Sequence, residues 1–167
     1  MDNMPIGGVL INGIAEAVIL IYLGLLLVGI KASKRRVFIA GLIQAVICYY
    51  LGRIFNFGIH TFMKYVSFVL LTWLIVQVPI LVSGISNCMA CVIALLLGNL
   101  NKIILPHIIG ISMEEILSRY WLRNFCFLPY LLIIFTITYL VGKYNFTLEE
   151  EIKILRDINR GADRIKG

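Results

Sequence analysis

The chain has 167 residues, of which 60% are hydrophobic and 14% are charged, and its formal net charge is +6. Soluble domains are about half apolar and about a quarter charged, so a mean hydropathy of +0.95 excludes an ordinary soluble domain. The basic residues gather in one loop and in the C-terminal tail without interleaved aromatic residues, which argues against nucleic acid as a partner. The composition predicts that the partner is the lipid bilayer.

Five apolar runs are long enough to cross about 30 Å of hydrocarbon as helices. In chain order they are Val9–Ile30, Val37–Phe55, Tyr65–Ser83, Cys88–Ile109 and Phe125–Gly142. The N-terminal "MDNMPIGG" lacks the basic region of a secretory signal, so the first run is expected to be a retained span. Backbone groups in lipid must pair within their own segment, which predicts helices. We therefore expect an all-α integral membrane protein, with a five-helix transmembrane domain at 1–145 and a cytoplasmic helical tail at 146–167.

Glycine and proline residues suggest where these helices end. Gly52, Gly84 and Gly110 are predicted to mark helix ends, and Pro79 is predicted to kink the third helix near its end. The uncharged stretch "SGISN", residues 83–87, is predicted to form the loop between the third and fourth spans.

The distribution of lysine and arginine predicts the orientation in the membrane. The loop between the first two spans and the C-terminal tail together carry ten of these residues, and the loops on the opposite side carry five. Cytoplasmic loops are enriched in lysine and arginine. We therefore predict a multi-pass protein of a bacterial cytoplasmic membrane, with the N-terminus outside and the C-terminus inside.

Residues 110–125, "GISMEEILSRYWLRNF", form a polar stretch between the last two spans. Ser112 and Glu115 fit a capping box at the start of a short helix. The apolar residues then share one face, which predicts an amphipathic helix on the outer interface. The spacing favours an inert connector over a lid above a ligand site, and both interpretations are compatible with it.

The tail carries an alternating three-four repeat that predicts a cytoplasmic helix. The repeated positions are Leu148, Glu151, Leu155, Ile158, Ala162 and Ile165. Five of these six residues are apolar, which is typical of a coiled-coil seam and would allow a homodimer through the tail. The short length and Gly161 make the seam marginal, so a solvated and partly frayed tail is equally compatible with the pattern.

Glu16 is the single acidic residue well inside a predicted span, and Asn12 lies one turn earlier on the same face. Intramembrane carboxylates are costly unless paired, so each is a functional candidate. The fourth span brings Asn99, Asn101 and Lys102 to a similar depth.

We predict an outward-facing ligand pocket among the first, second and fourth helices. Its residues would be Asn12, Glu16, Arg53, His60, Asn99, Lys102 and His107. The alternative is a structural hydrogen-bond cluster, with Glu16 protonated or bridged to Lys102 or Arg53. Gln44 and Gln77 are predicted to make helix-packing contacts.

Enzymatic and metal chemistry have little support in the sequence. Cys88 and Cys91 form a C-x-x-C, but neither a second pair nor a nearby histidine completes a four-ligand site, so small apolar residues are the favoured interpretation. The chain has no P-loop, G-x-S-x-G or H-E-x-x-H motif. We expect no catalytic residue, no metal and no cofactor.

Several stretches resemble a known family. "LVGIKASKRRVFIAGLIQA", "NFGIHTF" and "IIGISMEEILSRYWLRNFCFLPYLLII" followed by "GKYNF" resemble the membrane sensor part of Firmicutes GHKL-type sensor histidine kinases, whose cytoplasmic dimerising module is of the sporulation-phosphotransferase kind. The resemblance covers about residues 6–146 and preserves the order of the elements. In such kinases a phosphoacceptor histidine and an ATP-binding domain follow; here no histidine follows the last span. The resemblance therefore implies a stand-alone sensor domain.

The leading hypothesis is a sensor that binds a peptide, ion or lipid-like signal near Glu16, Asn99 and Lys102. The fifth helix and its tail would relay the signal, in a dimer, to a partner histidine kinase or another membrane protein. A second hypothesis is a small transporter component that captures a substrate and docks on an energising partner. A third is a structural membrane scaffold without a ligand.

Overall fold

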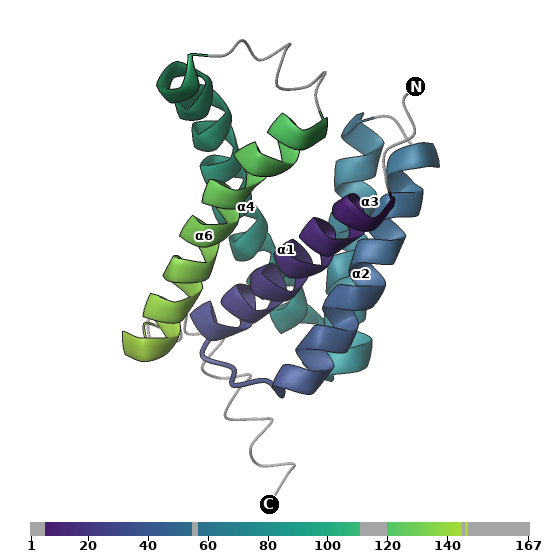
Figure 1. The fold of residues 1–167 in the computed structure, drawn as a ribbon. Coiled ribbons are helices and arrows are strands. Elements are labelled where there is room, and N and C mark those ends of the chain that lie inside the picture. The colour runs from purple at the N-terminus through teal and green to yellow at the C-terminus, as the bar shows by residue number, and fades with distance from the viewer. Residues whose placement is uncertain (1–5, 55–56, 111–119, 145, 147–167) are drawn as a thin grey trace, which may run out of the picture.

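A computed structural model of the chain describes residues 6–54, 57–110, 120–144 and 146 (Figure 1). These residues form helices and no strand, so the predicted all-helical class is confirmed for them. The helices are α1 (Ile6–Leu27), α2 (Lys34–Ile54), α3 (Phe57–Leu71) with its π-helical continuation η1 (Thr72–Val76), α4 (Ile80–Ile109) and α6 (Tyr120–Tyr144).

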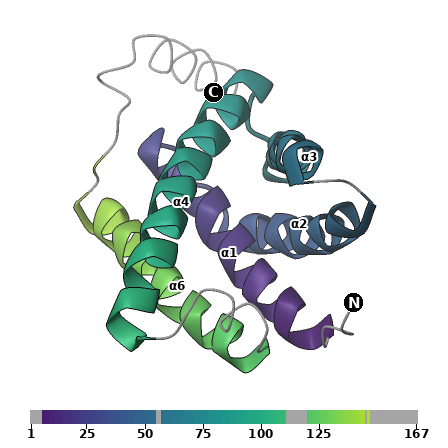
Figure 2. The same ribbon diagram turned by 90° about the horizontal axis from the view of Figure 1, so that it is seen from above.

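The first helix is the centre of the bundle. Figures 1 and 2 show α1 with α2 on one side and with α4 and α6 on the other, and α1 contacts all three. Leu23, Leu25 and Val28, at and just after the end of α1, are 0% exposed. A helix with neighbours on several sides is expected to be apolar over most of its surface. A shift of α1 would therefore change its contacts with α2, α4 and α6.

Two glycines allow α1 to approach its neighbours closely. A Cβ atom at Gly24 of α1 would lie 2.9 Å from the backbone carbonyl carbon of Ser86 in α4. A Cβ atom at Gly41 of α2 would lie 2.9 Å from the backbone nitrogen of Val18 in α1. Small residues at such crossings let the helix backbones pack without intervening side chains, and this close packing is one source of attraction between helices in lipid.

The predicted boundary between the third and fourth spans is wrong. Residues 83–87 and Gly84 lie inside α4, which begins at Ile80. The break is instead at residues 77–79, where Gln77 has a φ of 63° and Pro79 directly precedes α4. Proline has no backbone N–H to donate, so just before the first turn of a helix it leaves no intrahelical hydrogen bond unmade.

The small polar residues of the "SGISN" stretch are buried in helix contacts. The Asn87 amide donates to the Ser83 carbonyl oxygen at 2.8 Å and to the Thr72 hydroxyl at 3.0 Å. The Ser86 hydroxyl donates to the Ser83 carbonyl oxygen at 3.1 Å. Because these groups are satisfied within and between helices, the dip in hydropathy reflects a polar helix face and not a loop.

The helix ends elsewhere agree with the predicted spans to within a few residues, with α3 as the exception. Gly110 ends α4 in the left-handed conformation at φ 71°, and its N–H donates to the Pro106 carbonyl oxygen at 2.9 Å, as expected for a helix-ending glycine. The helix α3 begins at Phe57, eight residues before the predicted Tyr65. This earlier start places Lys64 inside a helix.

Four helical stretches among the described residues are long and apolar enough to cross a membrane: Lys34–Gly52, Ile59–Val76, Ile80–Ile108 and Asn124–Tyr144. In α1 the apolar stretch Asn12–Leu27 is shorter, although the whole helix has 22 residues. A helix of that length is about 33 Å long, which matches the hydrocarbon thickness. The start of α1 and the end of α6 lie at opposite ends of the bundle (Figure 1).

Large apolar side chains cover the outside of the bundle. Ile103 of α4 and Leu132 of α6 are each 64% exposed, and similar residues occur on α2 and α3. A soluble protein keeps contiguous exposed apolar patches small, because each exposed apolar area costs free energy in water. This surface is suited to contact with lipid.

Gln77 is the one non-glycine residue with a positive φ in the described part of the chain, and its Oε1 accepts a 2.7 Å hydrogen bond from Arg36 Nη1 at the start of α2. Replacing Gln77 by glycine or by alanine removes this bond in both cases. Only glycine also relieves the left-handed backbone, which costs other residues about 1 kcal/mol or more. We expect the Gln77→Gly protein to have a higher free energy of unfolding in detergent than the Gln77→Ala protein, by about 1 kcal/mol. Equal stabilities would contradict a strained turn.

The predicted amphipathic helix and the predicted tail fall mostly outside the described residues. The structure says nothing of residues 111–119 and 147–167. The last part of the polar stretch does belong to the described chain: α6 begins at Tyr120, five residues before the predicted Phe125.

Candidate functional site

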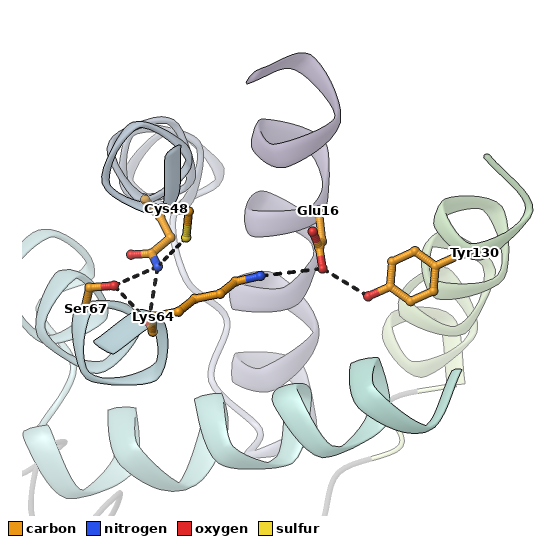
Figure 3. A network of polar contacts seen from close by, with 6 residues as sticks. Glu16, Cys48, Lys64, Ser67 and Tyr130 are labelled. Atoms are coloured by element: carbon orange, nitrogen blue, oxygen red, sulfur yellow. Dashed lines mark hydrogen bonds and ion pairs between the residues drawn. The ribbon is translucent and has the colours of Figure 1, made fainter. Parts of the chain in front are cut away.

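Glu16 lies at the middle of α1 and joins three helices (Figure 3). Its carboxylate oxygen Oε1 accepts a 3.1 Å hydrogen bond from the Tyr130 hydroxyl of α6. The same oxygen lies 3.8 Å from Lys64 Nζ of α3, which forms a salt bridge. We call Glu16, Lys64 and Tyr130 the Glu16 cluster. Glu16 is also the single acidic residue among the residues that the structure describes.

The lysine of the cluster is held by its own helix. The Lys64 ammonium lies 6.0 Å from the ring centroid of Phe68, one turn further along α3, and Phe68 is buried. The attraction between a cation and an aromatic face adds to the salt bridge. The side chain of Lys64 extends from α3 toward α1, so that its charged end reaches Glu16 (Figure 3).

A second set of hydrogen bonds attaches this part of α3 to α2. The Gln44 amide nitrogen lies 2.8 Å from Ser67 Oγ, 3.2 Å from the Lys64 carbonyl oxygen and 3.3 Å from Cys48 Sγ. The Ser67 hydroxyl donates to the same Lys64 carbonyl oxygen at 2.8 Å (Figure 3). Gln44 therefore makes the predicted helix-packing contact, and it fixes the backbone from which Lys64 extends.

Two further amides attach α6 to its neighbours. The Asn12 amide of α1 donates to Asn124 Oδ1 of α6 at 3.3 Å. The Asn101 amide of α4 donates to the Cys126 carbonyl oxygen of α6 at 2.8 Å. Together with the Tyr130–Glu16 bond, these contacts connect the first half of α6 to both α1 and α4. Polar contacts of this kind stabilise helix pairs in lipid by about 0.6 kcal/mol on average.

The structure brings only part of the predicted pocket together. Asn12 and Glu16 face α6, so the polar group lies among α1, α3 and α6 rather than among the first, second and fourth helices. Asn99 and Lys102 are exposed on α4. These two side chains point away from the bundle because α4 presents other residues to α1 and α6.

The remaining predicted pocket residues take other positions. His107 is exposed, and its Nδ1 lies 3.1 Å from the Ile103 carbonyl oxygen of its own helix. His60 of α3 faces α2, where its ring nitrogen Nε2 would lie 3.6 Å from a Cβ atom at Gly52. The side chain of Arg53 lies outside the described part.

Lys64 takes the position beside Glu16 that the sequence interpretation assigned to Lys102 or Arg53. The assignment to Lys102 is wrong because α3 begins earlier than predicted, so that Lys64 faces α1 from inside a helix. Lys64 could have been found from the sequence, since a lone cation inside an apolar helix is expected to seek an intramembrane acid. Tyr130 carried no such signal, because tyrosines are common throughout this chain.

The described residues include no group of three or more histidine, cysteine, aspartate or glutamate side chains that could hold a metal ion. Cys88 and Cys91 are free thiols, one turn apart in α4. The chemistry of the Glu16 cluster is therefore that of an ion pair with a hydrogen-bond donor, which can recognise a charged or zwitterionic group.

No protein-family model, curated protein or solved structure matches the chain.

Proposed function

We propose that the chain is a membrane-embedded sensor domain in which a ligand at the Glu16 cluster changes the position of α6. The observation that carries this proposal is the bond between Glu16, the single acid among the described residues, and Tyr130 of the last helix. An intramembrane acid is costly to keep, and its partners indicate what it controls. Here the partners are α3 and α6.

A ligand can reach the cluster from outside the bundle. The side chains of Glu16 and Lys64 are 20% and 30% exposed, so neither charge is sealed in the core. A ligand ammonium group can replace Lys64 beside the carboxylate, and a ligand carboxylate can replace Glu16 beside the ammonium. A peptide or another small zwitterion carries both groups, which makes it the ligand class that fits this pair best.

The last helix is suited to relay the change. Pro129 directly precedes Tyr130 and removes one backbone hydrogen bond of α6. A helix bends more readily at such a point. Loss of the Tyr130–Glu16 bond would free α6 at this bend, and α6 continues from there to Tyr144 at the other end of the bundle. The ligand supplies the shift only if it binds one arrangement of α6 better than the other.

The orientation follows from the basic residues. Their excess in the first loop and in the tail supports an outside N-terminus and a cytoplasmic C-terminus in a bacterial membrane. The resemblance to sensor histidine kinases supports a kinase as the partner and a dimer through residues 146–167. Labelling intact cells through a single cysteine placed at either terminus tests the orientation, and two ends on the same side would exclude it.

The ligand is tested with purified full-length protein in detergent, heated in the presence of dipeptides, tripeptides and fractions of spent culture medium. A binder raises the unfolding temperature, and above Kd the rise grows with the logarithm of the ligand concentration. We expect at least one probe to do so, and we expect Glu16→Gln to abolish that rise. Tyr130→Phe should weaken it, because the hydroxyl belongs to the cluster.

Tyr65→Phe is the matched control. It also removes one tyrosine hydroxyl from a helix–helix bond, at 3.0 Å to the Gly84 carbonyl oxygen, but between α3 and α4. This variant should lose similar stability and keep the ligand response. An equal response in Glu16→Gln and the natural protein would remove the Glu16 cluster from the binding site.

Capture of partners from native membranes separates the sensor from the other two classes. A tagged full-length chain should copurify with a histidine kinase after mild crosslinking. Copurification with a soluble ATPase and a membrane coupling subunit would instead identify a substrate-capture component of a transporter. The absence of any stabilising probe, together with neither partner, would leave a structural scaffold.

A further inference from the structure

A groove of about 1190 Å³ lies between α2 and α6, with α1 as its floor. Both α2 and α6 contact α1, and they lie on opposite sides of it (Figure 2). The lining is apolar and aromatic. Tyr22 and Leu26 of α1 lie on the floor, and Phe38 of α2 with Phe135 and Tyr139 of α6 form the walls. The groove exceeds the volume of most small-molecule pockets, which are about 300–1,000 Å³.

Four basic residues gather at one end of the groove. They are Lys31 in the first loop, Lys34 and Arg35 at the start of α2, and Lys143 near the end of α6. All four are exposed, and none forms a salt bridge with another of the described residues. No acidic side chain lines the groove. The site therefore combines a long apolar channel with a concentrated positive charge at one mouth.

We propose that this groove binds an anionic phospholipid, with the acyl chains along the aromatic walls and the phosphate among Lys31, Lys34, Arg35 and Lys143. The lipid would bridge α2 and α6 and thereby limit the movement of the last helix. This site is distinct from the Glu16 cluster and shares no residue with it.

The charge and the shape favour this occupant over the alternatives. Basic pockets between transmembrane helices on the cytoplasmic side bind anionic head groups, and each lysine or arginine near the head-group level contributes about 1 kcal/mol. A soluble phosphate would use the cations but not the apolar walls. A second copy of this chain would bring the same four cations to the groove, and like charges repel. A lipid with an anionic head group matches both the walls and the charged mouth.

The test is fluorescence quenching by brominated lipids in vesicles that contain the full-length chain. Trp73 and Trp121 are replaced by phenylalanine, and a single tryptophan is placed at Tyr139, a half-exposed position on the groove wall. We expect brominated phosphatidylglycerol to outcompete brominated phosphatidylcholine at this reporter by about ten-fold or more. A tryptophan placed instead at Leu132, exposed on α6 outside the groove, should show no such preference.

Charge-neutralised variants make the result specific. Lys143→Gln should reduce the preference for phosphatidylglycerol about five-fold, whereas Lys102→Gln, an exposed lysine on α4 at the other end of the bundle, should leave it unchanged. Neutralising all four basic residues should abolish the preference. Quenching by brominated phosphatidylcholine reports whether each variant is still inserted in the bilayer.

Three outcomes would overturn the proposal. Equal quenching by the two lipids would mean that the groove is filled by ordinary lipid, by another copy of the chain or by residues after Phe146. Competition by millimolar inorganic phosphate would mean a site for free phosphate. A preference for phosphatidylglycerol that survives in the four-fold neutralised protein would place its cause elsewhere on the chain.

Discussion

Replacing Gly24 by alanine is expected to lower the free energy of unfolding by about 2 kcal/mol. The new Cβ would lie 2.9 Å from the Ser86 backbone carbonyl carbon of α4, closer than such atoms can approach. Because the obstacle is backbone and not a flexible side chain, α1 and α4 must move apart. The expected loss exceeds the gain of about 1 kcal/mol that alanine normally brings to a helix interior. Reversible unfolding in detergent, followed by circular dichroism, measures it.

Gly13→Ala is the matched control for that experiment, because it makes the same chemical change in the same helix. Its Cβ would lie 3.7 Å from the Cβ of Ala45, an ordinary contact. The control should keep or raise the stability, since alanine favours the helix more than glycine does. If Gly24→Ala and Gly13→Ala were equally stable, the close crossing of α1 and α4 would be contradicted.

Replacing Lys64 by methionine is expected to destabilise the bundle by about 2 kcal/mol. The substitution leaves the Glu16 carboxylate, which is only 20% exposed, without its cation. Breaking a fully buried ion pair costs more, about 3–5 kcal/mol, and the partial exposure of both side chains reduces the penalty. Lys102→Met, which removes an exposed lysine from α4, should change the stability by about 0.5 kcal/mol or less.

The double variant tests whether the loss comes from the ion pair itself. Glu16→Gln removes the charge but keeps an oxygen that can accept the Tyr130 hydrogen bond. Combined with Lys64→Met, it should restore at least half of the lost stability, because no unpaired charge is left in the bundle. A double-mutant cycle measures the coupling. Strictly additive losses would mean that Glu16 and Lys64 do not interact.

Measuring both the stability and the ligand response of these variants separates the structural role of the Glu16 cluster from its proposed signalling role. A ligand response that survives when stability falls, as expected for Tyr65→Phe, shows that loss of stability alone does not abolish sensing. A response that disappears in the stable Glu16→Gln/Lys64→Met protein would show that the charges themselves are needed. If the Glu16 cluster binds a ligand as proposed, binding would require both charges, whereas packing of the bundle would not.

The helical class and the approximate number of helices follow from the sequence alone. Long apolar runs can satisfy their backbone groups in lipid only as helices, so composition decides the secondary structure before any contact forms. The end of α4 at Gly110 was also predictable, because glycine adopts the left-handed conformation there without strain. Glu16 was also predictable as a functional candidate from the sequence alone, because an acid inside an apolar span is costly wherever its partners lie.

The break between the third and fourth spans could not be read from hydropathy. Residues 83–87 include glycine and small polar residues, as loops do, but Ser83, Ser86 and Asn87 donate hydrogen bonds to carbonyl oxygens and to Thr72 inside the bundle. Whether a polar residue lies in a loop or in a helix interface depends on the partners that it finds, and those partners come from the neighbouring turns and helices.

The partners of Glu16 were decided by the tertiary structure. Lys64 and Tyr130 lie 48 and 114 positions further along the chain, and their approach depends on the start of α3 and on how α1, α3 and α6 are rotated about their axes. The apolar runs determine that these helices form, but lipid solvates any apolar face equally well and so does not select the rotation. The close crossings at Gly24 and Gly41 and the few polar bonds between helices select it. For that reason the acid could be found in the sequence, whereas the site around it became visible only in the folded bundle.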